Sequence, residues 1–251
     1  MASESLESLW NWWDFLPPTL CSSLRFDALG HGKSPFDAEG KGHVDWKWEG
    51  VGDTMIRLGE AAAATVTTTM MMKTTAGKSS SSSTASAPRL SKYIVGGASM
   101  GAASALWAAT THPGEVSGIV MVIPPTCFRS RKGRRTKIRD VISRGGKAFY
   151  RAKGKLIRPI FACHSSDNNV MTGALESDFP PLKALENVKV RKIPMLVCGW
   201  DCDDSTHPMA TILLLEKLFP HARICIAKSL GQVLKEWPVE ITNFVVNVTQ
   251  K

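Results

Sequence analysis

The sequence lacks any apolar run long enough to cross a membrane. Its longest clean run, Ile119–Ile123, is a small fraction of the roughly 20 residues that a membrane helix needs. The first residues show no basic region followed by an apolar stretch, so we expect no secretory signal. None of the 6 cysteines forms a C-x-x-C pair, and several lie in apolar, strand-like runs. We therefore expect reduced, buried thiols in a cytoplasmic protein, with no disulfide framework.

Metal and phosphate motifs are also missing. The Cys and His residues do not have the spacing of metal ligands, so no metal site and no cofactor are expected. No G-K-[ST] follows the glycine-rich stretch near residue 97, which excludes a phosphate-binding loop of that type.

The net charge of +9 arises in one segment of the chain. Residues 129–158 hold thirteen Lys and Arg and a single acid, Asp140, so the rest of the chain is slightly acidic. We interpret this segment as a solvated helical cap. The alternatives are nuclear targeting or binding to an acidic partner such as RNA or anionic lipid. Aromatic residues are few there, so nucleic-acid binding is not expected.

The first third of the chain has mixed signals. Residues 5–16 have apolar residues at helical spacing, residues 24–28 are typical of a short strand, and residues 46–64 indicate a helix. Residues 65–88 are rich in Thr, Met, Ser and Ala. This composition cannot bury enough apolar surface to offset its ordering entropy, so we expect a flexible surface insertion.

The remainder alternates apolar strands with helices, which is typical of an α/β protein with a mostly parallel sheet and helices on both faces. We predict a single domain over residues 1–251, with the basic cap inserted at about 124–185. The predicted strands are 93–96, 118–123, 193–198 and 223–227, and the predicted helices are about 100–111, 208–219 and about 237–247.

The motif G-x-S-x-G occurs at Gly97–Gly101, between a buried strand and an alanine-rich helix. In this context the serine, Ser99, sits on a strained strand-to-helix turn, and its neighbours two residues away on each side must be very small. The following helix directs its first N–H groups at an oxyanion, and the Met100 N–H is the expected donor. The alternative is a glycine-rich turn with an incidental serine.

Several segments resemble the α/β-hydrolase superfamily. The resemblance covers roughly residues 9–60 and 90–248, and Ile123–Thr126 with the D-x-x-H-P turn at Asp204–Pro208 resembles an esterase-like branch. Three further segments resemble the D-x-R-G-H-G-x-S turn, the H-P-x-R-V segment and the penultimate strand with its acid turn: Arg25–Ser34, His112–Val116 and Ile193–Asp204.

The resemblance implies a catalytic acid on the turn after the penultimate strand and a histidine after the last strand. Asp203 and Asp204 both fit the acid, and the spacing does not decide between them. The usual histidine position holds Gln232, whose amide cannot act as a general base. His207, on the acid turn, is the candidate replacement; the alternative is a loop histidine that bonds the backbone.

The superfamily normally has three strands before the D-x-R-G-H-G turn, and only about 23 residues precede that turn here. The expectation is a fold without its first three strands: a truncated gene model, a short isoform, or a domain completed by a partner strand. An exposed gap in the sheet would favour self-association. The expected function is hydrolysis of a small-molecule ester or related acyl substrate by Ser99. The alternative is a pseudoenzyme or fragment that binds a small ligand or a protein partner.

Overall fold

The computed structural model of the protein has a four-stranded, fully parallel sheet in the order β1-β2-β3-β4. The strands are β1 (Tyr93–Ala98), β2 (Val116–Val122), β3 (Met195–Trp200) and β4 (Arg223–Ala227). The structure describes residues 16, 23–24, 26, 47–75, 92–128, 130–131, 176–201 and 207–250, and for 66–75 it describes the backbone alone.

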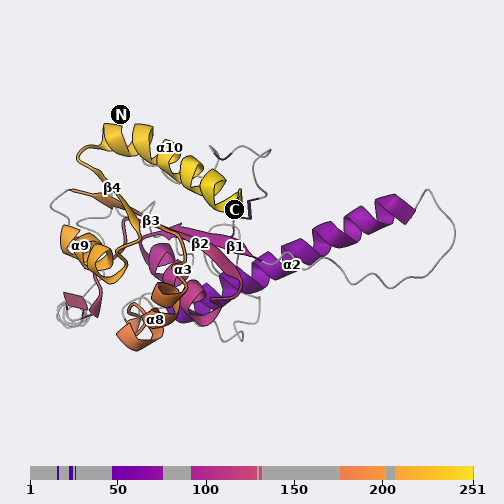
Figure 1. Ribbon diagram of the computed structural model, residues 1–251, viewed down its shortest axis with the longest axis horizontal. Coiled ribbons are helices and arrows are strands. Elements are labelled where there is room, and N and C mark those ends of the chain that lie inside the picture. The colour runs from indigo at the N-terminus through magenta and orange to yellow at the C-terminus, as the bar shows by residue number, and fades with distance from the viewer. Residues whose placement is uncertain are drawn as a thin grey trace, which may run out of the picture.

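Helices cover both faces of this sheet, as predicted. In Figure 1, α10 lies across one face, and α3, α8 and α9 lie on the other, while α2 runs past the β1 side and projects beyond the sheet. Among these helices, none is long and apolar enough to cross a bilayer. The helices are α2 (Trp48–Thr75), α3 (Met100–Thr111), α8 (Leu182–Val190), α9 (Met209–Leu218) and α10 (Leu230–Thr249).

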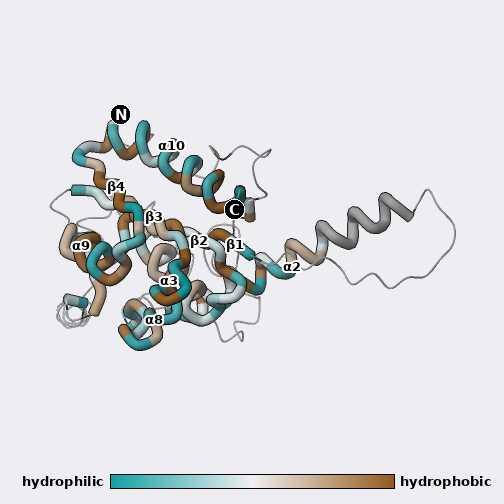
Figure 2. The backbone as a smooth tube through the Cα atoms, in the orientation of Figure 1, coloured by the Kyte–Doolittle hydropathy of each residue, from teal (hydrophilic) through white to brown (hydrophobic). Residues whose placement is uncertain are grey.

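Alternation along the central strands divides the core into two layers. In β2, Ile119 and Met121 belong to the core on the α3 side, whereas Val120 and Val122 belong to the core on the α10 side. All four are at most 1% exposed, because a parallel strand covered on both faces buries every side chain. The strands and α3 are accordingly rich in apolar residues, whereas α10 alternates between apolar and polar residues along its length (Figure 2).

Small residues allow α2 and α3 to pack closely. A Cβ at Gly52 would lie 2.6 Å from the carbonyl oxygen of Ser104 and 2.9 Å from the amide nitrogen of Ala108. The facing side of α3 consists largely of buried alanines, which add little side-chain volume between the helix axes. This contact holds α3 against α2 as well as against the sheet.

Polar contacts join the two ends of the predicted cap insertion, the segment at about 124–185. Arg131 donates from Nε to the carbonyl of Ser177 (2.6 Å), and its guanidinium carbon lies 4.0 Å from the ring centroid of Trp48. Oδ1 of Asp178 accepts the N–H groups of Phe128 (2.7 Å) and Phe179 (2.8 Å). At least one arginine of the basic segment is therefore a packing residue. Residues 132–175, between these ends, lie outside the described part of the chain.

The N-terminal third differs from the predictions. Leu24 and Phe26 are not in a strand, which corrects that prediction at these two positions. The predicted helix at 46–64 continues to Thr75, through the first part of the 65–88 segment, and residues 76–88 lie outside the described residues. Of the predicted helix at 5–16 only Leu16 is described, as a bend that packs against the core beneath α10.

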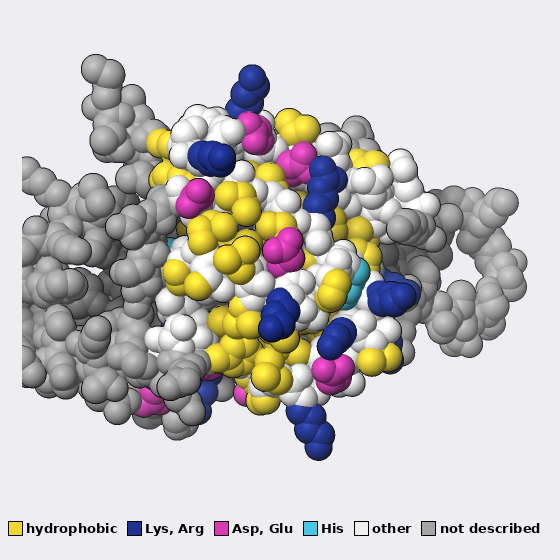
Figure 3. All heavy atoms as spheres, turned by 60° about the vertical axis from the view of Figure 1, so that its left-hand side comes forward, with side chains coloured by type: hydrophobic (Ala, Val, Ile, Leu, Met, Phe, Trp, Pro, Cys, Tyr) yellow, Lys and Arg dark blue, Asp and Glu magenta, His cyan; other side chains and the backbone are white. Residues whose placement is uncertain are grey.

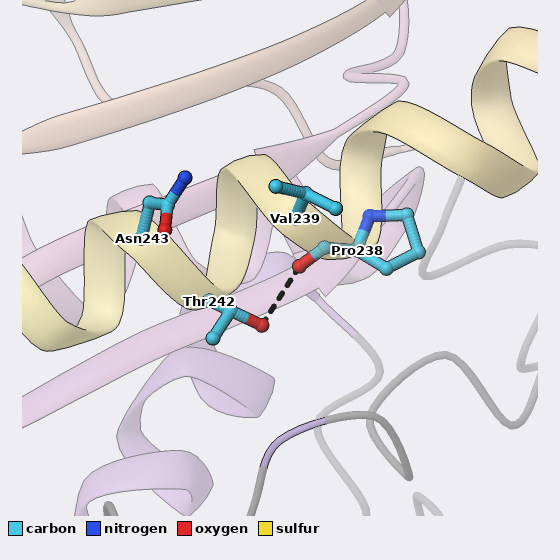
Figure 4. A pocket seen from close by; sticks show the side chains of 4 residues that line it. All are labelled: Pro238, Val239, Thr242 and Asn243. Atoms are coloured by element: carbon cyan, nitrogen blue, oxygen red, sulfur yellow. Dashed lines mark hydrogen bonds between the residues drawn. The ribbon is translucent and has the colours of Figure 1, made fainter.

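Helix α10 begins earlier than the sequence predicts. The predicted start is near residue 237, where Pro238 would occupy a position that proline favours, the first turn of a helix. The helix instead begins at Leu230, with Ser229 as its N-cap, and contains Pro238 internally. Pro238, Val239, Thr242 and Asn243 line a shallow hollow of about 270 Å³. Figure 4 shows these four side chains on α10. The hydroxyl of Thr242 donates to the Pro238 carbonyl at 2.8 Å.

Strand β4 forms one edge of the described sheet. Its side chains are more exposed than those of β2 and β3, and Ile226 is 39% exposed. Leu213 on α9 and Leu234 on α10 are also exposed. Figure 3, which brings this side of the molecule forward, shows apolar side chains between scattered charged ones.

Candidate functional site

Ser99 occupies the single residue between β1 and α3. Its φ of 52° and ψ of −114° lie in a region that residues with a side chain rarely adopt. The amide of Ser99 donates to the carbonyl of Val122 at 2.9 Å, which continues the pairing of β1 with β2 into the turn. The serine is thus held at the carboxyl edge of the sheet in the strained strand-to-helix turn that the motif predicts.

Gly97 and Gly101 flank Ser99, but only one of them lacks room for a side chain. A Cβ at Gly97 would lie 2.6 Å from the carbonyl carbon of Gly101 and 2.8 Å from its Cα, and backbone atoms cannot move aside. A Cβ at Gly101 would meet nothing within 4 Å. The prediction that both positions must be very small therefore holds at Gly97 and is corrected at Gly101.

His207 contacts the serine directly. Its Nε2 lies 2.8 Å from Ser99 Oγ, which is within hydrogen-bonding distance. His207 lies on the connection between β3 and α9, two residues before α9 begins. If the proton of the neutral ring is on Nδ1, Nε2 is the acceptor for the serine hydroxyl. The sequence-predicted pair is therefore brought together by the fold.

The start of α3 presents N–H groups beside the serine. Met100 is the first residue of α3, and the first N–H groups of a helix have no intrahelical acceptor. Further along this first turn, the N–H groups of Ala102 and Ala103 donate to the Ser99 carbonyl at 3.0 and 3.3 Å. The partial positive charge of the helix N-terminus lies at the same place, and it favours negative charge near Ser99.

Comparison with known proteins identifies the architecture. A hydrolase from Oleispira antarctica superposes with a TM-score of 0.61 at 18% identity, over 94% of this chain and 86% of that one. A thermophilic esterase from Thermogutta terrifontis gives 0.55 at 16% identity, over 96% and 85%. A carboxylesterase structure from Nitrososphaera gargenis gives 0.55 at 18% identity, over 91% and 79%. This chain has the α/β-hydrolase fold. Sequence comparison finds no matching family model and no matching curated protein.

Gln232 occupies the place that the α/β-hydrolase resemblance assigns to a histidine, and it has a structural contact there. Its Oε1 accepts the N–H of Lys228 at 2.7 Å, and its own N–H donates to Ser229 Oγ at 3.2 Å. These two bonds form a reciprocal cap at the start of α10, similar to a capping box. The residue that replaces the histidine thus stabilises a helix terminus.

The α/β-hydrolase resemblance implies a catalytic acid on the turn after β3. The structure describes the two ends of this turn, Asp201 and His207. Asp201 has an exposed side chain, and its amide donates to the Ala227 carbonyl at 2.8 Å, which fixes the start of the turn to the end of β4. His207 is at the other end. The two acid candidates, Asp203 and Asp204, lie outside the described residues, so the choice between them stays a prediction.

Cys127 is a residue of this region that sequence reasoning did not single out. It is 4% exposed, and burial together with the neighbouring Asp178 carboxylate raises the pKa of its thiol to about 12, against a bond to Thr211 that lowers it. A thiol with such a pKa is not a thiolate at neutral pH and is a poor nucleophile. In the described part of the chain, no group of three His, Cys, Asp or Glu residues could hold a metal ion.

Proposed function

We propose that the protein is a serine hydrolase that cleaves an ester or related acyl bond of a small molecule. Ser99 is the nucleophile, His207 is the general base, and the Met100 N–H is an oxyanion donor. The observation that carries this proposal is the 2.8 Å separation of Ser99 Oγ and His207 Nε2, on a strained turn at a helix N-terminus. The esterases and hydrolases among the structural neighbours agree with it.

The proposed reaction proceeds in two halves and needs no cofactor. Ser99 Oγ attacks the acyl carbonyl carbon while its proton passes to His207 Nε2, and the Met100 N–H stabilises the oxyanion. The C–O bond to the leaving group then breaks, and His207 returns the proton to the departing alkoxide. Water attacks the acyl-enzyme with the same base, releasing the acid and restoring Ser99. Asp203 or Asp204 would accept a hydrogen bond from Nδ1.

The proposal places the imidazole on a different loop from that of the family pattern. The connections after β3 and after β4 leave the same edge of a parallel sheet, so either can approach a serine at the end of β1. His207 comes from the loop after β3, whereas Gln232 lies in the first turn of α10, the helix that follows β4. The base and its acid would then belong to one short turn.

The alternative is a non-catalytic protein that binds a small ligand or a protein partner through the same fold. The observation that favours it is Gln232, whose side chain caps a helix in place of the expected histidine. The two functions differ in one property, since only the hydrolase requires Ser99 to be an activated nucleophile.

A fluorophosphonate probe with intact-mass and peptide analysis tests the proposal, because it labels activated serines. The wild-type chain should take up one probe at Ser99, and Ser99→Ala should take up none. His207→Gln should slow labelling by about 10²–10⁴-fold, the usual contribution of a general base. The matched control is His221→Gln, since Nε2 of His221 contacts the Ile193 carbonyl at 3.0 Å.

The control variant should label at the wild-type rate. Thermal unfolding of all four proteins checks that they are folded. An unlabelled, folded wild-type protein would favour the binding function, and equal rates for the two histidine variants would remove His207 from the mechanism.

A further inference from the structure

Cys198 and Cys225 form a thiol pair across two strands, separate from the proposed catalytic site. They are direct register partners in the parallel pairing of β3 with β4. Both side chains belong to the core on the α10 side, so they lie on the same face of the sheet. Neighbouring strands are about 4.8 Å apart, within the roughly 4.4–6.8 Å range of Cα separations that disulfides span. Both cysteines are free thiols in this structure.

The environments of the two thiols differ. Cys198 is fully buried, and Cys225 is half-buried on β4, which forms an edge of the described sheet. Their side chains hydrogen-bond, which lowers the pKa of Cys225 and raises that of Cys198, and burial raises the latter further. Arg223 also lowers the pKa of Cys225, whereas burial and the carboxylates of Glu240 and Glu236 oppose the decrease.

We propose that Cys198 and Cys225 are a peroxide-sensitive redox site that closes reversibly into a disulfide. The Cys225 thiolate attacks one oxygen of hydrogen peroxide, the O–O bond breaks, hydroxide leaves, and Cys225 becomes a sulfenic acid. The Cys198 sulfur then attacks the Cys225 sulfur, the S–O bond breaks, and water leaves with the Cys198 proton. Two thiols are oxidised by two electrons, and one peroxide is reduced.

The arrangement assigns a distinct role to each thiol. Cys225 is the peroxide-reactive thiol because it is the more exposed of the two and carries the greater thiolate character. Cys198 is the resolving thiol because it is inaccessible to peroxide yet directly opposite its partner. Cys127 is an internal reference, since it is also buried but has no cysteine as a register partner on a neighbouring strand in the described sheet.

The test uses the full chain treated with increasing hydrogen peroxide, followed by alkylation and non-reducing digestion. Chymotrypsin together with trypsin separates Cys198 from Cys202, because Trp200 lies between them. The expected product is a Cys198–Cys225 cross-linked peptide that dithiothreitol releases, with Cys127 alkylated only after unfolding. In the reduced protein, Cys225 should react with iodoacetamide at least about tenfold faster than Cys127.

Single substitutions separate the two steps. Cys198→Ala should leave a Cys225 sulfenic acid that dimedone captures, and Cys225→Ser should give neither a disulfide nor a trapped sulfenic acid at Cys198. The proposal is overturned if wild-type Cys225 accumulates as sulfenic or sulfinic acid without cross-linking to Cys198. It is equally overturned if Cys225 couples to a second chain, or if it reacts no faster than Cys127. Thermal unfolding confirms that each variant is folded.

Discussion

Ser99 Oγ and His207 Nε2 lie 2.8 Å apart although 108 positions separate the two residues in the chain. The parallel sheet explains this proximity, because the carboxyl ends of β1 and β3 point toward the same edge. Strand β2 lies between them, so the β1 turn and the β3 loop must both reach over its end. The contact therefore depends on tertiary structure, and local sequence alone does not produce it.

Gly97→Ala should destabilise the protein by about 1–3 kcal/mol or more, because the new Cβ would overlap the backbone of Gly101. Gly101→Ala is the matched control. The Cβ of an alanine at position 101 would meet no atom within 4 Å. This substitution should be neutral or should stabilise the protein by up to about 1 kcal/mol, because alanine is more favourable than glycine inside a helix. Urea unfolding of both variants measures the difference, and equal losses would contradict the geometry described for this turn.

Asp178→Ala should lower the free energy of unfolding by about 1–3 kcal/mol, because two N–H groups, of Phe128 and Phe179, lose their acceptor. Asp178→Asn retains a carbonyl oxygen at the same place and should cost less. Denaturant unfolding monitored by tryptophan fluorescence provides the comparison. If the asparagine variant were as unstable as the alanine variant, the charge of Asp178 would matter more than its hydrogen bonds.

Gln232→Ala should reduce stability by about 0.5–1 kcal/mol through loss of the bond to the Lys228 amide. The same variant should keep the wild-type rate of fluorophosphonate labelling, because Gln232 caps α10 and has no part in the proposed chemistry. Differential scanning calorimetry and the labelling assay check the two expectations. A marked loss of labelling in a folded variant would place Gln232 in the site.

The sequence predicts the sheet and its helices well where apolar runs are bounded by turn residues. The predicted strand at 223–227 coincides with β4, and the predicted helix near 100–111 coincides with α3. These elements are recognisable because their composition and periodicity agree with the fold around them. The class of fold follows from the same alternation of strand and helix.

Other boundaries were missed for identifiable reasons. Pro238 is typical of a first helical turn, but the cap formed by Ser229 and Gln232 begins the helix earlier. The composition of residues 65–88 predicted a flexible insertion, but α2 continues through the first part of this segment to Thr75. The contact of His207 with Ser99 could be proposed from the acid turn, but its distance depends on how β3 is placed relative to β1. The partnership of Cys198 with Cys225 depends on strand register, which the sequence does not reveal.

Arg131, Ser177 and Asp178 form a clamp of hydrogen bonds between the two ends of the cap insertion, and this clamp affects how much the sheet depends on the residues in between. Pairing β2 with β3 brings together segments that are separated by the whole of the intervening insertion. The clamp joins the two ends of that insertion through hydrogen bonds among the described residues. The spacing of β2 and β3 at this point is therefore set outside residues 132–175. We expect substitutions within 132–175 to leave the register of the sheet and the position of Ser99 unchanged, as long as Arg131 and Asp178 are retained.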